Sequence, residues 1–318
     1  MVNSTKDISK TMQALDSQTF KTRDATSYDA VTEQFDFFTE RLTSPLAARL
    51  VSLAEIKPSD SVLDVGTGTG VVALLAAKKI AEGGKVHGID LSEGMLATAM
   101  AKAGKLGLEE KVKFSQMDAE NLEFEAETFY AVVSLFALLH FPNPLTALKE
   151  IYRVMRPGGR FVVAVGSRPP LFSASGLSHL VKIFPDLVRR KQGRQLVAPG
   201  FLDSLVEQHL PKAREQEESD LASHSHNRTS GVSELVRSAG FKVLQTDWQS
   251  HQAQLATPED FWEIQRTFSS ISRKRLSNAA PEKVELLRQE FFEQCRTVQS
   301  RGGNLVYPFA AFYVVAEK

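Results

Sequence analysis

The sequence predicts an α/β fold whose core is a Rossmann-like doubly wound sheet of about seven strands, mostly parallel with an antiparallel last strand, carrying helical cap inserts. Two observations predict the sheet. Near-continuous apolar strands alternate with amphipathic helices over residues 59–166, and glycines occupy alternate positions directly after the first strand. A third observation predicts the inserts, because the alternation stops after Ser167 although apolar residues at helical spacing continue.

The regular part of the chain reads as strands and helices in turn. The expected strands are SVLDV (61–65), KVHGID (85–90), KVKFSQMD (111–118), FYAVVSLFALL (129–139) and GRFVVAVG (159–166). The expected helices run from Gly70 to about Glu82, over SEGMLATAMAKAGKLG (92–107), whose Ser92 and Glu93 suit a helix start, and over PLTALKEIYRVM (144–155). Since parallel strands are joined by right-handed crossovers, ligands are expected beyond the carboxyl ends of these strands.

The rest of the chain is expected to extend this core and to cover it. Amphipathic pieces, LSHLVKIFPDLVRR (177–190) and FLDSLVEQHL (201–210), precede a helix over 231–240, a strand over 241–249, a helical insert at about 257–300 and a last strand over 305–317. We therefore expect an N-terminal helical segment over the ligand site (1–58), a binding core (59–166), a helical cap insert (167–227) and the end of the sheet with its insert (228–318).

Composition and charge argue against several classes of protein. The 318 residues are 42% hydrophobic and 24% charged, and Lys+Arg and Asp+Glu balance at 38 each, so no net field draws the chain to nucleic acid or anionic lipid. A single cysteine, Cys295, excludes an internal disulfide and fits a reducing compartment. The polar N-terminus lacks the apolar core of a signal peptide, and the longest apolar stretch, AVVSLFALLHF, is too short for a membrane span. We expect a cytoplasmic protein.

The glycine turn VLDVGTGTG (62–70) indicates a nucleotide-like ligand. Gly66, Gly68 and Gly70 remove three side chains from one turn, so either a ligand approaches the backbone closely or the chain bends sharply. Such a turn between a buried strand and a helix usually opens a nucleotide-binding α/β fold. The third glycine of a dinucleotide fingerprint is replaced by Val71, however, and no lysine follows as in a phosphate-binding loop.

Three acidic residues at strand ends narrow the choice of ligand. Asp64 suits a positively charged amino group, and Asp90 could accept hydrogen bonds from both hydroxyls of a ribose. Asp118 could accept from the amine of an adenine whose ring nitrogen meets the backbone N–H of Ala119. Asp90 could instead cap a helix, and DAEN around Asp118 also reads as a turn. An amine, a ribose and an adenine without phosphate describe S-adenosylmethionine.

These motifs resemble class I S-adenosylmethionine-dependent methyltransferases, in particular the branch related to ubiquinone and menaquinone biosynthesis C-methyltransferases. The resemblance is carried over roughly residues 25–166 by VLDVGTGTG, VHGIDLSEGML, QMDAENLEF and SLFALLHFPNPLTALKEIYRVMRPGGRFVVAV. It implies S-adenosyl-L-methionine as the cofactor. The cofactor-binding residues that it implies, from the methionine end through the ribose to the adenine and the sulfonium, are Tyr28, Asp64, Gly66, Thr67, Gly68, Gly70, Asp90, Leu91, Met95, Asp118, Ala119 and Phe136.

Two side-chain roles stay open on the sequence alone. His140, in ALLHFPNP, lies where a general base would be needed for an acceptor that arrives protonated, but it could instead shape the pocket. Tyr28 could reach over the cofactor or simply pack in a core. No metal is expected, because His224 and His226 lie in a polar stretch typical of a solvated loop.

The resulting hypothesis is a methyltransferase for a small to medium, largely apolar metabolite. The inserts, which are rich in Phe, Leu and Trp262, favour such an acceptor over nucleic acid or protein. A homodimer is compatible with the sequence. One alternative is an NAD-dependent oxidoreductase, which Val71 and Asp64 argue against. Another is a non-catalytic cofactor-binding protein of the same fold.

Overall fold

The computed structural model describes residues 17–81, 83–166, 185, 188–198, 200–210 and 229–318. The described part contains one eight-stranded sheet with the order β3-β2-β1-β4-β5-β8-β6, and β7 pairs with β8. The strands are β1 (Ser61–Val65), β2 (Lys85–Asp90), β3 (Val112–Gln116), β4 (Phe129–Leu135), β5 (Met155–Gly166), β6 (Gln195–Val197), β7 (Lys242–Leu255) and β8 (Asn304–Glu317). This confirms the predicted α/β fold.

The direction of the strands places a crevice at the middle of the sheet. Strands β1 to β5 are parallel, and β8 runs antiparallel to β5 and β7. The first strand lies between β2 and β4, so the chain winds outward in opposite directions from the β1–β4 pair. In a doubly wound sheet this is where ligands bind, beyond the carboxyl ends of the strands.

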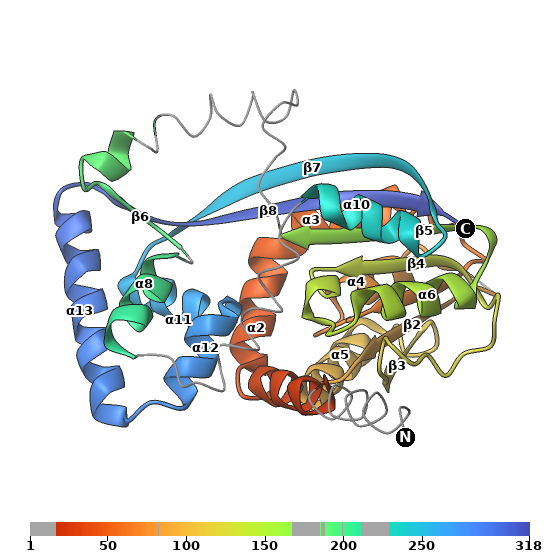
Figure 1. The fold of residues 1–318 in the computed structure, drawn as a ribbon, viewed down its shortest axis with the longest axis horizontal. Helices are drawn as coiled ribbons and strands as arrows, with labels where there is room; N and C mark the ends of the chain where they lie inside the picture. The colour runs from red at the N-terminus through yellow and green to blue at the C-terminus, as the bar shows by residue number, and fades with distance from the viewer. Residues whose placement is uncertain (1–16, 82, 167–184, 186–187, 199, 211–228) are drawn as a thin grey trace, which may run out of the picture.

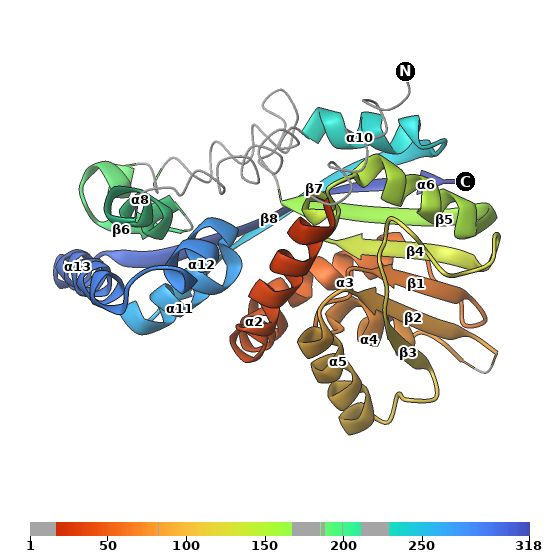
Figure 2. The same cartoon turned by 60° about the horizontal axis from the view of Figure 1, so that its bottom comes forward.

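Helices cover both faces of the sheet. Helices α3 (Ser44–Leu53), α4 (Val71–Ala77) and α5 (Glu93–Leu106) lie on one face, and α6 (Pro144–Val154) and α10 (Thr229–Ser238) on the other (Figure 2). Helix α6 shows why: Ala147, Leu148, Ile151 and Val154 recur at helical spacing and are fully buried against the strands. Burying each large aliphatic side chain in this stripe contributes roughly 1.5–3 kcal/mol.

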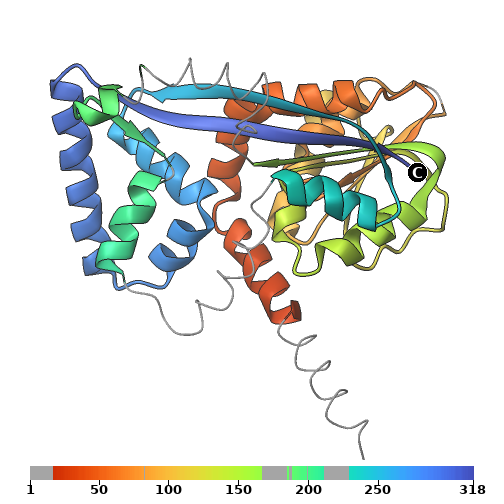
Figure 3. The same cartoon turned by 45° about the horizontal axis from the view of Figure 1, so that its top comes forward.

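A helical lobe extends the molecule away from this core. Strands β7 and β8 pair from Lys242↔Glu317 to Leu255↔Leu305, with one register shift between Val243 and Gln245, and their far ends carry the lobe (Figures 1 and 3). The lobe consists of α8 (Gly200–His209), α11 (Pro258–Phe268), α12 (Ser270–Ser277) and α13 (Pro281–Ser300). Its helices pack around buried aromatic rings, among them Phe261, Trp262 and Phe291. The insert predicted at 257–300 corresponds to three of these helices.

The N-terminal helices lie between the core and the helical lobe (Figure 1). They comprise helical residues 17–29, α2 (Thr32–Phe38) and a π-helical turn, η1 (Thr39–Thr43). Lys102 of α5 holds α2 to the core through an ion pair with Asp36 at 2.7 Å and reaches Glu40 at 2.8 Å. Residues of this segment also line the site predicted at the carboxyl ends of the strands.

Some element boundaries differ from the prediction. Strand β7 was expected to end at Gln249 but continues to Leu255, because its polar second half pairs with residues 305–310 of β8. Helix α4 ends at Ala77, since the chain turns there to bring Ile80 back into the core. Strand β6 has only three residues, too few to show a periodic pattern. Most of the predicted 167–227 insert lies outside the described residues.

No helix within the described ranges has both the length and the apolar character needed to cross a membrane.

Candidate active site

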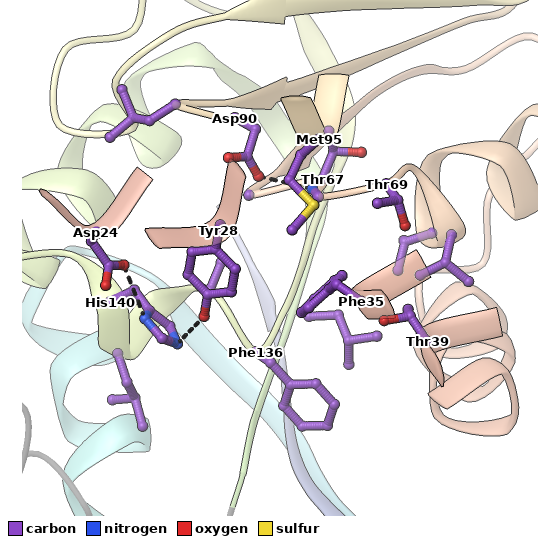
Figure 4. A pocket seen from close by; sticks show the side chains of 18 of the residues that line it. Asp24, Tyr28, Phe35, Thr39, Thr67, Thr69, Asp90, Met95, Phe136 and His140 are labelled. Carbon is purple, nitrogen blue, oxygen red and sulfur yellow. Dashed lines mark hydrogen bonds and ion pairs between the residues drawn. The ribbon is translucent and has the colours of Figure 1, made fainter. Parts of the chain in front are cut away.

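A cavity of about 580 Å³ lies at the carboxyl ends of β1, β2 and β4, with walls from the core, the N-terminal helices and the helical lobe (Figure 4). Its volume falls within the roughly 300–1,000 Å³ of small-molecule sites. Most residues predicted for the site line this cavity: Tyr28, Gly66, Thr67, Gly68, Asp90, Leu91, Met95, Asp118, Ala119, Phe136 and His140.

The glycine turn forms one wall of the cavity with its backbone. The N–H groups of Gly66 and Thr67 both donate to the carbonyl of Ile89 at 2.9 Å, which folds the turn over the end of β2. Gly66 has φ +71°, and a Cβ atom there would stand 2.2 Å from the Cβ of Ala137. Only glycine fits this position, because both the space and the left-handed backbone exclude a side chain.

Two predicted residues, Gly70 and Asp64, support the turn from behind and are not among the residues that line the cavity. A Cβ atom at Gly70 would come within 3.0 Å of Ala99, so this glycine allows α4 and α5 to pack closely. Asp64 is 1% exposed, and its Oδ2 accepts hydrogen bonds from the Thr67 hydroxyl at 2.7 Å and the Ala73 N–H at 3.0 Å. Both residues therefore shape the cavity indirectly.

Burial raises the pKa of Asp64 to about 7, against the opposing effect of its two hydrogen bonds. We predict that Asp64→Asn flattens the pH dependence of folding. In the wild-type protein the protonated Asp64 stabilises the folded state. This contribution to the free energy of unfolding is complete below about pH 4 and is lost as the pH rises through 7, by up to about 4 kcal/mol. An amide keeps the acceptor oxygen but does not ionise. The measurement is urea unfolding of the cofactor-free protein and the variant at pH 5 and pH 8. A stability difference between them that is the same at both pH values would contradict the prediction.

Asp90 lies at the end of β2 with both carboxylate oxygens at the cavity. Its Oδ2 accepts from the Gly68 N–H at 2.8 Å, and its Oδ1 accepts from the Ser92 N–H at 3.0 Å. Burial raises the pKa of Asp90, and these backbone donors oppose the shift. Since each carboxylate oxygen has a further lone pair, Asp90 can still accept hydrogen bonds from two ligand hydroxyls.

Asp118 holds the N-terminal helix as well as lining the cavity. Its Oδ2 lies 2.8 Å from the Nζ of Lys21, which also binds Glu120 at 2.8 Å. The backbone N–H of Glu120 donates to the Oδ1 of Asp118 at 2.9 Å. An adenine amine would have to share this carboxylate with Lys21, a residue that the sequence analysis did not single out.

Two buried hydroxyls lie on the side of the cavity away from Asp24 and His140 (Figure 4). Thr39 and Thr69 line it, are 5% and 1% exposed, and have no hydrogen-bond partner for Oγ1 within the described part of the chain. Buried hydroxyls normally find partners, so these two are suited to polar ligand groups. Together with the bare backbone at Gly66 and Gly68, they fit the charged amino-acid end of S-adenosylmethionine. Thr39 belongs to the π-helical turn, a geometry common at functional sites.

His140 lies in a short 3₁₀ helix, η2 (Leu138–His140), directly after β4. Its Nε2 is 3.5 Å from the hydroxyl of Tyr28, and its Nδ1 is 3.4 Å from Oδ2 of Asp24. Figure 4 shows Asp24 and Tyr28 both directed at the imidazole. Asp24 was not singled out from the sequence, although its spacing from Tyr28 places both on one face of the helix.

Aromatic side chains form the wall that faces the helical lobe. Phe35 lies 5.3 Å from Phe268, measured between ring centroids, and Phe268 lies 6.0 Å from Tyr307, which stacks on Phe309 at 4.5 Å. All four line the cavity and come from α2, α11 and β8. The site thus has a polar half at the glycine turn and an aromatic half at the helical lobe.

Phe136 carries backbone strain at the junction of these halves. It has φ +62°, a left-handed conformation that is uncommon for a bulky residue, and its N–H donates to the carbonyl of Ala164 at 2.8 Å. Such strain concentrates at functional sites, where the surrounding structure holds it.

No group of three His, Cys, Asp or Glu side chains within the described ranges could hold a metal ion. His224 and His226 lie outside these ranges.

The central part of the chain is similar in sequence to known methyltransferases. Residues 62–159 match the family described as Methyltransferase domain. The chain is 32% identical over 146 residues to the demethylmenaquinone methyltransferase of Symbiobacterium thermophilum, covering 45% of this chain and 58% of that protein. It is 28% identical over 194 residues to the aklanonic acid methyltransferase DauC of Streptomyces sp. strain C5, covering 61% of this chain and 82% of that protein.

A solved structure shows the same fold. The candidate methyltransferase BH2331 of Bacillus halodurans C-125 has a TM-score of 0.52 and 22% identity, covering 86% of this chain and 98% of that one. The chain spans about three fifths of the Symbiobacterium protein. The family match includes the glycine turn, Asp90, Asp118 and His140, whereas Tyr28 and the helical lobe lie outside it.

Proposed function

We propose that the chain is a class I S-adenosylmethionine-dependent methyltransferase and that it transfers the methyl group of S-adenosyl-L-methionine to a small to medium, largely apolar ring compound. The observation that carries this proposal is the division of one continuous cavity into a polar half at the glycine turn and an aromatic half at the helical lobe. A cofactor and an acceptor can therefore meet inside it.

The polar half has the groups that the cofactor needs. Asp90 would hold the ribose, Asp118 and Ala119 the adenine, and Thr39 and Thr69 the amino-acid end. When bound, S-adenosyl-L-methionine supplies an electrophilic methyl group on a sulfonium. Holding the acceptor about 3–3.5 Å from that methyl group, in line with the bond that breaks, supplies much of the rate.

The aromatic half suits a planar acceptor. Phe35, Phe268, Tyr307 and Phe309 offer ring faces and edges, and aromatic pairs of this kind gain about 0.5–1.5 kcal/mol beyond burial. Two of the similar proteins are named for demethylmenaquinone and aklanonic acid, both oxygenated ring systems. We therefore propose a quinone-like or polyketide-like acceptor, which the helical lobe encloses.

We also propose that the enzyme is cytoplasmic and that its partner is a small-molecule methyl acceptor. A cytoplasmic enzyme would keep its buried free thiol, Cys295, reduced. No nucleic acid is required by the site, and a homodimer is a state that sedimentation can test.

Calorimetry with three ligands tests the cofactor. S-adenosylmethionine and its demethylated product S-adenosylhomocysteine should each bind one site per chain, with dissociation constants in about the micromolar range. NAD should show no heat of binding, because the turn lacks the third glycine of the dinucleotide fingerprint. Binding of NAD in preference to S-adenosylmethionine would contradict the proposal and favour an oxidoreductase. Binding of S-adenosylmethionine without turnover of any acceptor would favour a non-catalytic role.

A further inference from the structure

We propose that Asp24 is the positioning residue for His140 as a general base, and that the acceptors of this site are therefore phenols or enols rather than amines or thiolates. The inference rests on the proposed methyl transfer, because it concerns the proton that such an acceptor must lose. It is carried by a contact between two helical segments that are distant in the sequence.

Asp24 is placed to fix the tautomer of His140. It is 8% exposed, its Oδ2 lies 3.4 Å from Nδ1 of His140, and its Oδ1 lies 2.9 Å from Nζ of Lys274 in α12. Burial raises the pKa of Asp24, but His140 and Lys274 outweigh it and bring the pKa well below its usual range. An ionised carboxylate beside Nδ1 accepts its hydrogen, which leaves the lone pair of the ring on Nε2. The contact is long, as is common before a substrate binds.

The lone pair on Nε2 faces the cavity beside Tyr28. Burial raises the pKa of Tyr28, and the nearby guanidinium of Arg273, 4.0 Å from the ring centroid, opposes the shift without reversing it. Tyr28 is thus a neutral phenol at neutral pH and can donate a hydrogen bond but cannot serve as the base. An acceptor oxygen bound near both groups would accept from Tyr28 and donate to His140.

Charged and titratable groups approach the imidazole of His140 from three elements of the fold. Asp24 and Tyr28 face it from residues 17–29, Asp90 acts on it from β2, and Lys274 and Arg273 approach Asp24 and Tyr28 from α12. The cations Lys274 and Arg273 contact Asp24 and the ring of Tyr28, respectively.

The step balances as a proton transfer coupled to a displacement. The acceptor O–H bond breaks and its proton goes to Nε2 of His140. The oxygen electron pair forms the new bond to the methyl carbon as the carbon–sulfur bond breaks, and the sulfonium becomes a neutral thioether. The imidazolium then releases its proton to solvent.

If Asp24 had a purely structural role, its replacement by Asn would leave the tautomer of His140 unchanged. In that case the carboxylate only joins the N-terminal helix to α12 through Lys274. Asp29 provides a matched control, since it lies on the same helix and accepts hydrogen bonds from the Ser92 hydroxyl and from the Gly94 N–H at 3.1 Å. Asp29→Asn perturbs the docking of this helix without touching His140.

The first test needs neither cofactor nor acceptor. Nitrogen-15 chemical shifts of the His140 ring, assigned by comparison with His140→Ala, should show the Nδ1–H tautomer in the wild-type protein and in Asp29→Asn. Asp24→Asn should change the tautomer, because the new amide can donate to Nδ1. The same tautomer in the wild-type protein and Asp24→Asn would overturn the inference.

The second test compares two matched probes, 2-hydroxyanthraquinone and 2-aminoanthraquinone, with S-adenosylmethionine. We expect methylation of the phenol, a kcat for Asp24→Asn about 10²-fold lower at similar KM, and loss of the acidic limb of the pH–rate profile. Asp29→Asn should keep that limb. Methylation of the amine but not the phenol would overturn the inference and leave methyl transfer intact. A protein that does not bind S-adenosylmethionine in calorimetry would instead refute the proposed function.

Discussion

Replacing His140 by alanine is expected to lower kcat for a phenolic acceptor by about 10²–10⁴-fold, with the affinity for S-adenosylmethionine unchanged. The imidazole faces the cavity between Asp24 and Tyr28 and is well separated in sequence from the glycine turn. Its removal would delete the proposed proton acceptor and leave the proposed cofactor contacts in place. Initial rates at saturating acceptor and calorimetry with the cofactor give the two quantities.

His140→Asn separates the base from a residue that only shapes the cavity. Asparagine keeps a polar side chain near the Tyr28 hydroxyl but cannot take up a proton at neutral pH. If the variant keeps most of the activity and the wild-type pH–rate profile, His140 is not the base. Methyl transfer would then depend on proximity and orientation alone.

The second large effect is expected at the ribose end. Asp90→Ala should weaken binding of S-adenosylmethionine by roughly 2–4 kcal/mol, because two charge-assisted hydrogen bonds to ribose hydroxyls are lost. The Gly68 and Ser92 N–H groups, which donate to Asp90, would turn to water in the open cavity. Calorimetry measures the affinity, and a thermal melt reports whether the variant is folded.

Asp118→Asn is a suitable comparison for Asp90→Ala. It changes a carboxylate at the adenine end, where Lys21 and Glu120 already share the charge, and it keeps an acceptor oxygen. Its effect on affinity should be smaller than that of Asp90→Ala. A folded Asp90→Ala protein with wild-type affinity would remove Asp90 from the site.

The sequence predicted the core well because local and tertiary preferences coincide there. Strands β1 and β2 were predicted with their observed bounds, since each is an apolar run that ends before a glycine turn or a helix start. Helix α5 begins where Ser92 caps it, with the Ser92 hydroxyl accepting from the Met95 N–H, and ends at Gly107 in a left-handed conformation.

The remaining parts depend on contacts between distant segments, which no local pattern encodes. The second half of β7 is polar and becomes a strand only because β8 pairs with it. The proposed role of Asp24 depends on its contacts with His140 and Lys274, and the position of Lys21 depends on its ion pair with Asp118. The pattern also could not separate residues that line a cavity from those that support it, as Asp64 shows.

The proposed family and cofactor could be predicted because the glycine turn and the two strand ends are local sequence motifs. The acceptor could not, because its half of the cavity is assembled from Phe35, Phe268, Tyr307 and Phe309 on segments outside the family match. Any one of these rings reads in the sequence as an ordinary core residue.

Transfer of a labelled methyl group tests the central claim most directly. The protein would be incubated with S-adenosylmethionine carrying a trideuteriomethyl group and with a panel of demethylmenaquinol, 2-hydroxyanthraquinone and 2-aminoanthraquinone, and the products analysed by mass spectrometry. We predict that the label appears on demethylmenaquinol or 2-hydroxyanthraquinone together with an equal amount of S-adenosylhomocysteine, and that His140→Ala forms about 10²-fold less of both at early times. A protein that binds S-adenosylmethionine but neither labels any member of the panel nor releases S-adenosylhomocysteine would contradict the account.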